Sequence, residues 1–112
     1  MPPSDLHVLD DDALVVRARA GDAAAYGELV RRHQRAALRV AAVVSGSTEE
    51  ASDIVQDAFM AAHRGLHTYR GTGSVRSWML RVVANQARNS SRARGRRRRR
   101  DDGDERRRPD DV

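Results

Sequence analysis

Apolar residues recur every three or four positions along most of the chain, which is the spacing that places them on one side of a helix. The pattern predicts helices over about residues 11–20, 23–44, 48–65 and 75–93. No stretch alternates apolar and polar residues in the manner of a strand. We therefore expect an all-α fold, a compact helical bundle of three main helices preceded by a short leading helix.

Residues that start and stop helices stand at the ends of these segments. Gly21 follows the first predicted helix, and Asp22 can cap the second. Ser47 followed by Glu50 matches a capping box at the start of the third, and Ser74 can cap the fourth. These signals support four separate helices.

The two ends of the chain differ in composition from its middle. We expect residues 1–9 to form a flexible arm and residues 10–96 to form the folded domain. The Arg/Asp-rich segment 97–112 has almost no apolar side chains to offset its ordering entropy. We therefore expect 97–112 to be a disordered linker.

Charge is concentrated in one part of the sequence. Residues 1–87 hold ten arginines and ten acidic residues, whereas residues 88–100 hold eight arginines and no acid. Residues 101–112 hold three arginines and six acids, and the net charge is +5. A neutral body followed by a strongly positive segment favours an anionic partner such as nucleic acid.

Candidate catalytic and metal-binding groups are few. The absence of cysteine excludes a disulfide scaffold and a thiolate zinc site. His63 and His67 have a spacing that can bind zinc, but no third ligand is evident, and Asp53 and Asp57 have no general-acid partner. No apolar run has the length of a membrane span. We expect no enzyme, cofactor, metal, membrane or small-molecule substrate.

The third predicted helix carries a polar stripe beside its apolar one. Asp53, Gln56, Asp57 and Met60 recur at helical spacing, and Phe59 stands at the border of the stripe. Two acids, an amide and a soft apolar group could dock against a basic partner helix. The alternative is an ordinary solvated face.

The fourth predicted helix carries a basic stripe. Arg81, Asn85, Arg88 and Arg92 share one face, with Asn89 beside them. Arginines can contact phosphates and an asparagine amide can read a base edge. The alternative is a face of arginines that serves only to keep the helix hydrated.

A loop of helix-breaking residues precedes this helix. His67, Tyr69 and Arg70 lie there among small residues, and they could present a shallow pocket and a ring to an unstacked base. Alternatively, Tyr69 folds back onto the core. Trp78 lies on the apolar stripe, so we expect it in the core.

Three segments, in order, resemble region 2 of bacterial sigma factors of the extracytoplasmic-function (ECF) class. Residues 50–62 (EASDIVQDAFMAA) resemble the acidic DxxQ(E/D)xF helix, and residues 77–92 (SWMLRVVANQARNSSR) resemble the WLxxIAxNxxRDxxR helix. Residues 12–29 (DALVVRARAGDAAAYGEL) resemble the first two helices of that family. The likeness covers about residues 10–96.

The resemblance implies a transcription initiation domain in the bacterial cytoplasm, at the nucleoid during initiation. It would bind the β′ clamp helices of core RNA polymerase through Asp53, Gln56, Asp57, Phe59 and Met60. It would also recognise and melt the promoter −10 element, with a base flipped from the non-template strand into the loop. The DNA-contacting residues so implied are His67, Thr68, Tyr69, Arg70, Gly71, Thr72, Gly73, Ser74, Arg76, Ser77, Arg81, Asn85, Arg88, Asn89 and Arg92.

The resemblance further implies an anti-sigma partner and a second, helix-turn-helix domain that reads the −35 element beyond residue 112. The sequence departs from the family at Asn89, where an acid is usual, and at Asp57, where glutamate is commoner. Two other functions remain open from the residues alone. One is a helical adaptor that docks a protein through its acidic helix, and the other is a nonspecific RNA-binding domain.

Overall fold

The computed structural model describes residues 3–106, with side chains for residues 5–93 and 95. Its elements are η1 (Pro3–Val8), α1 (Asp11–Arg19), α2 (Ala23–Ser45), α3 (Ala51–Arg64), η2 (Leu66–Thr68) and α4 (Val75–Arg106), where η denotes a 3-10 helix. No strand occurs among these residues, so the predicted all-α class is confirmed. No helix within them is long and apolar enough to cross a membrane.

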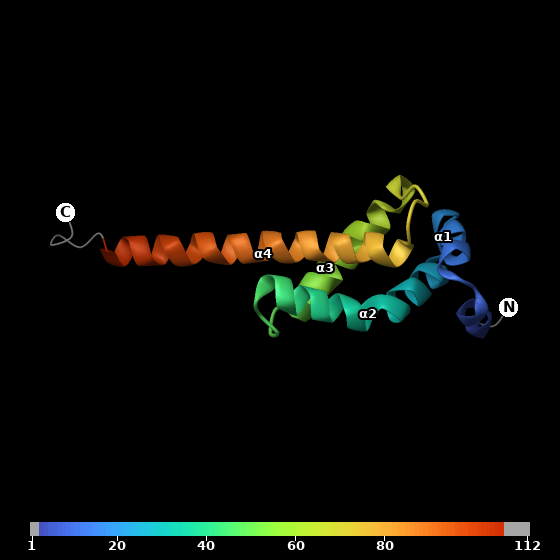
Figure 1. Cartoon of the computed structure of the whole chain (residues 1–112), viewed down its shortest axis with the longest axis horizontal. Coiled ribbons are helices and arrows are strands. Elements are labelled where there is room, and N and C mark those ends of the chain that lie inside the picture. Colours follow the sequence, from blue (N-terminus) through green and yellow to red (C-terminus); the bar gives the residue numbers. More distant parts are fainter. Residues whose placement is uncertain (1–2, 107–112) are drawn as a thin grey trace.

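Helices α2, α3 and α4 pack against one another, and α1 covers one end of this bundle (Figure 1). The largest fully buried side chains come from α1, α2 and α4: Leu14, Leu29, Val75, Met79 and Val83. Much of the remaining core is alanine, and its small side chain lets helix backbones approach closely. Trp78 packs against this core, as predicted.

The predicted caps form at α2 and α4, whereas the hydrogen bond predicted for the third helix lies in the turn before α3. A side-chain oxygen of Asp22 accepts hydrogen bonds from the N–H groups of Ala24 and Ala25 at 3.1 and 3.2 Å. Ser74 Oγ accepts from the N–H of Ser77 at 3.0 Å at the start of α4. Ser47 Oγ accepts from the N–H of Glu50 at 3.2 Å, but α3 itself begins only at Ala51, three residues later than predicted.

The N-terminal segment differs from the flexible arm that the sequence predicted. Pro3–Val8 forms a 3-10 helix, and Leu6 is buried in the core. The Arg32 guanidinium on α2 donates to the carbonyl oxygens of Leu6 and His7 at 3.2 and 3.1 Å. One apolar anchor and one distant arginine therefore order a segment that has little apolar content of its own. Residues 1–2 of the predicted arm lie outside the described residues.

Helix α4 continues to Arg106, whereas the sequence predicted its end near residue 93 and disorder from 97. The prediction rested on the lack of apolar residues beyond residue 93. Two backbone properties nevertheless favour a longer helix. Arginine is a good helix former, and extending an existing helix requires no new nucleation. The second half of α4 therefore continues the helix begun by the packed first half, and it projects beyond the bundle (Figure 1). Residues 107–112 of the predicted linker lie outside the described residues.

Candidate functional site

The polar stripe of α3 lies on the surface. Asp53, Gln56 and Asp57 are exposed, and Met60 is 54% exposed beside them. Within the described part of the chain none of the four has a hydrogen-bond or ion-pair partner. Phe59 differs from the prediction, because its side chain is only 6% exposed and belongs to the core. We call Asp53, Gln56, Asp57 and Met60 the acidic face.

An apolar groove of about 600 Å³ lies between α2 and α3 and reaches the acidic face. Its lining includes Tyr26, Val30, Leu38, Val55, Phe59 and Met60. The Tyr26 hydroxyl donates to the Phe59 carbonyl oxygen at 2.5 Å, and burial raises the pKa of Tyr26 to about 12, so this donor keeps its proton at neutral pH. The groove was not predicted, because it joins residues of two helices about 30 positions apart.

The loop between α3 and α4 is shaped by Tyr69. Its ring is 5% exposed and packs against Trp78 with ring centroids 5.6 Å apart. Its hydroxyl donates to the Gly73 carbonyl oxygen at 3.2 Å. Of the two alternatives for Tyr69, the structure favours the core, and the prediction that its ring offers a surface for an unstacked base is not supported.

Two loop glycines adopt a backbone conformation that other residues rarely take. Gly71 and Gly73 have φ of 77° and 78°, so a side chain at either would strain the turn. The other predicted loop residues are exposed: His67, Thr68, Arg70, Thr72 and Ser74. The loop therefore presents polar side chains to solvent, while the buried ring of Tyr69 anchors it to the core.

Arg19 at the end of α1 also holds this loop, and sequence reasoning missed it. Its Nε donates to the Leu66 carbonyl oxygen at 3.1 Å, and its Nη2 donates to the Tyr69 carbonyl oxygen. Its guanidinium carbon lies 5.7 Å from the centre of the Tyr69 ring. These residues are 47 and 50 positions apart in sequence, so no local pattern could have linked them.

The basic stripe of α4 is exposed, as its helical spacing predicted. Ser77, Arg81, Asn85, Arg88, Asn89 and Arg92 are all accessible. Asn85 Oδ1 accepts from Arg88 Nη2 at 2.6 Å, which orients the amide and leaves its N–H groups free to face a ligand. We call Arg81, Asn85, Arg88, Asn89 and Arg92 the basic face.

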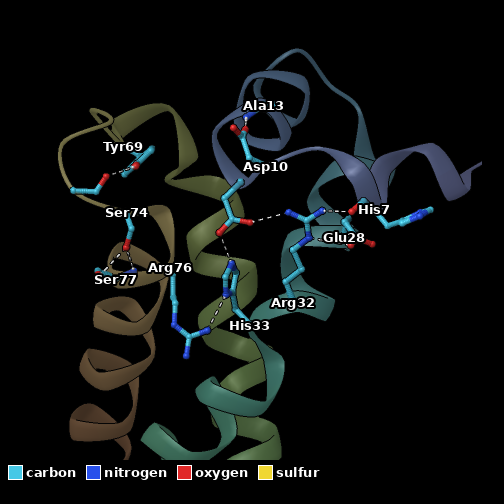
Figure 2. A network of polar contacts seen from close by, with 12 residues as sticks. His7, Asp10, Ala13, Glu28, Arg32, His33, Tyr69, Ser74, Arg76 and Ser77 are labelled. Atoms are coloured by element: carbon cyan, nitrogen blue, oxygen red, sulfur yellow. Dashed lines mark hydrogen bonds and ion pairs between the residues drawn. The ribbon is translucent and has the colours of Figure 1, made fainter.

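Arg76 is exposed and also takes part in a network that joins three helices (Figure 2). Its Nη1 lies 3.3 Å from Nδ1 of the buried His33 on α2, and His33 Nε2 lies 2.8 Å from Asp11 Oδ2 on α1. A neutral imidazole that donates from Nε2 and accepts at Nδ1 satisfies both contacts. The arginine predicted to contact DNA thus helps to fasten α4 to α2.

Arg32 extends the same network toward the N-terminal segment. Its Nη1 lies 3.1 Å from Asp11 Oδ1 and its Nε lies 3.0 Å from Glu28 Oε2. Hydrogen bonds from Arg31 and Arg32 lower the pKa of the Glu28 carboxyl, so it is ionised at neutral pH. The network therefore ties α1, α2 and α4 together.

The acidic and basic faces lie on consecutive helices that pack together, at the residues where the sequence placed them. The Sigma-70 region 2 family model matches residues 29–97, which include both faces and the loop. The chain belongs to the sigma-70 region 2 family. Sigma factors are non-catalytic transcription initiation factors, so this sigma region 2 domain is not an enzyme.

The similar curated proteins are ECF sigma factors. The sigma region 2 domain is 40% identical over 79 residues to the ECF RNA polymerase sigma factor SigM of Mycobacterium tuberculosis, covering 70% of this chain and 40% of that protein. It is 37% identical over 87 residues to the RNA polymerase sigma-H factor of Pseudomonas aeruginosa, covering 78% and 45%. It is 38% identical over 91 residues to the ECF RNA polymerase sigma-E factor of Escherichia coli K12, covering 80% and 46%.

The alignments span less than half the length of these relatives. No solved structure shows a significant match to the sigma region 2 domain. Within the described residues, no three histidine, aspartate or glutamate side chains gather in a way that could hold a metal ion.

Proposed function

We propose that this domain binds core RNA polymerase through α3 and captures single-stranded DNA of the promoter −10 element with the loop and α4. The supporting observation is that two packed helices expose opposite chemistries. The acidic face consists of two carboxylates, an amide and Met60 on α3, none of them paired within the described residues, and the basic face consists of arginines and asparagines on α4. One domain can therefore hold a basic protein surface and an anionic strand at the same time.

The acidic face and the groove beside it support the polymerase contact. Asp53 and Asp57 supply negative charge, and Met60 leads from them into the apolar groove. A partner helix with basic and apolar sides would place its charges on the carboxylates and its apolar residues over the groove. The β′ clamp helices of core polymerase are the partner that family membership supports.

The loop and the basic face support the DNA contact. The arginines can hold phosphates, while Asn85 presents oriented amide donors to a base edge. Removing a base from the duplex costs about a few kcal/mol, which contacts with the exposed loop must offset. The protein would then melt the −10 element by stabilising the open non-template strand.

The two contacts are tested separately. Core polymerase pulled down with the full chain should decrease for Asp53→Ala and Gln56→Ala, with the exposed Glu49→Ala as a control that removes an acid outside the acidic face. Fluorescence anisotropy should show preference for −10-like single strands over scrambled ones, and this preference should decrease for Asn85→Ala. If about four phosphates are contacted, the log–log salt slope should be roughly −3. Unchanged polymerase capture by both α3 variants would contradict the proposal.

A helical adaptor is the second candidate, because the acidic face and the groove could dock a basic amphipathic helix without any DNA. An adaptor would bind −10-like and scrambled strands equally. An RNA-binding domain would prefer RNA and would ignore the α3 substitutions. An anti-sigma partner and a location in the bacterial cytoplasm are further expectations that rest on family membership.

A further inference from the structure

An exposed side of α2 carries a row of arginines that neither proposed contact uses. Arg31, Arg35 and Arg39 follow one another at every fourth residue, and all three are exposed. We call these three residues the α2 ridge. The groove between α2 and α3 is lined by the neighbouring row of the same helix, which consists of Tyr26, Val30, Gln34 and Leu38. The α2 ridge is therefore separate from the groove, from the acidic face and from the basic face.

Most of the positive charge of the α2 ridge is not neutralised. Helix α2 has four arginines and a single acid, Glu28. Glu28 Oε1 lies 2.5 Å from Arg31 Nη2, and the Arg31 side chain is still 66% exposed. Arg35 and Arg39 have no hydrogen-bond or ion-pair partner within the described residues. Two free guanidinium groups and one partly neutralised group are thus available to an anionic partner.

The spacing of the α2 ridge suits a nucleic-acid backbone. Residues four apart on a helix are separated by a rise of about 6 Å, so the three arginines extend over about 12 Å. The phosphates of one strand of a duplex recur about every 3.4 Å along its axis, so the ridge can lie beside about three or four of them. Guanidinium groups also match the geometry of phosphate oxygens with paired N–H donors.

An acidic protein fits the α2 ridge less well. The buried centre of a protein–protein interface is largely apolar. The next residue of the row, Val43, is 81% exposed, but it is the one large apolar side chain that the row offers. Electrostatic contact with phosphates needs no apolar centre, because the release of counterions supplies the affinity. The observations therefore favour nucleic acid.

We propose that the α2 ridge binds the phosphate backbone of double-stranded DNA without reading its sequence. Contacts between arginines and phosphates position a protein on a duplex and carry no sequence information. This contact goes beyond the proposed promoter contact, which places single-stranded DNA on the loop and α4. The α2 ridge gives the domain a second nucleic-acid surface, which holds paired DNA.

The test measures how the affinity of the full chain for a random-sequence DNA duplex depends on salt, by fluorescence anisotropy. Each phosphate contact contributes about −0.9 to the log–log slope, so Arg35→Gln/Arg39→Gln should make the slope less steep by about 2. Arg35→Lys/Arg39→Lys keeps both charges and should retain the parent slope. The control pair Arg17→Gln/Arg64→Gln removes two exposed arginines outside the α2 ridge and should also retain it.

Both glutamine pairs keep every arginine of α4, so a difference between them reports the α2 ridge. An unchanged slope in Arg35→Gln/Arg39→Gln, or an equal change in the control pair, would overturn the proposal. Weaker binding of poly-glutamate by Arg35→Gln/Arg39→Gln with an unchanged duplex slope would assign the ridge to an acidic protein, and this too would overturn it. The −10 preference and its decrease in Asn85→Ala are measured on single strands, so failure of the α2 ridge is distinguishable from failure of the proposed function.

Discussion

The acidic face of α3 and the loop that follows α3 are adjacent in sequence but are built differently. Asp53, Gln56 and Asp57 come together through the repeat of one helix, and no distant residue positions them. The loop takes its shape from Arg19 on α1 and Trp78 on α4. Side chains on the exposed face of α3 can therefore be substituted without affecting the fold. Substitutions in the loop, in contrast, also affect its contacts with α1 and α4.

The largest effect is expected for Tyr69→Ala, which removes the ring that supports the loop. Loss of a buried aromatic side chain should lower the free energy of unfolding by about 3–5 kcal/mol, measured by urea denaturation. Tyr69→Phe keeps the ring and loses only the hydrogen bond to Gly73, so it should cost about 1 kcal/mol. Equal losses in the two variants would show that the ring does not support the loop.

Arg19→Ala tests the tie from α1 and should have a smaller effect. Arg19 is exposed, so loss of its two hydrogen bonds should lower stability by only about 1 kcal/mol. Amide hydrogen exchange should accelerate in the loop while the α3 amides keep their rates. The exposed Arg35→Ala on α2 is the control. Unchanged exchange over residues 66–70 would mean that the loop holds its shape without α1.

The pH dependence of stability tests the hydrogen bonds that Arg31 and Arg32 donate to Glu28, all three residues being on α2. Its pKa in the folded protein lies below the ordinary 4.5, because Arg31 and Arg32 donate hydrogen bonds to it. The stabilisation is therefore present above pH 4.5 and is lost as the pH falls through the lowered pKa. Urea unfolding midpoints should depend less on acid pH in Glu28→Gln than in the parent. Parallel pH profiles would contradict this.

Asp53→Ala should have the smallest effect on stability, because the side chain is exposed and unpaired. The free energy of unfolding should change by no more than about 0.5 kcal/mol. Capture of core polymerase should nevertheless fall by about tenfold, as expected for loss of an interfacial charge contact. A large loss of stability would show that the acidic face is coupled to the fold after all.

The sequence could predict features that arise within one helix, but it could not predict features that join residues from distant parts of the chain. The helices, most of their caps and the exposure of the polar stripes on α3 and α4 follow from local spacing, and the structure confirms these predictions except for the start of α3 and the end of α4. The buried ring of Tyr69, the role of Arg19 and the groove between α2 and α3 depend on residues that are far apart in sequence. Periodicity within one helix carries no information about such contacts.

Arg76 and Phe59 also make contacts that the sequence pattern did not reveal. Each packs against or bonds to a residue of another helix, although Arg76 remains exposed and Phe59 lines the groove beside the acidic face. Arg76 meets His33 of α2, and the Phe59 side chain enters the core. The binding roles of the other site residues remain predictions that the experiments above can test.

Helix α4 runs without a break through 32 residues, which makes it a rod about 50 Å long. Its first half packs against α2 and α3, and its second half stands clear of the other helices (Figure 1). A rod transmits torque along its axis. A force on the projecting half is therefore carried along one continuous helix into the bundle, where Val83 and Ala87 are packed in the core.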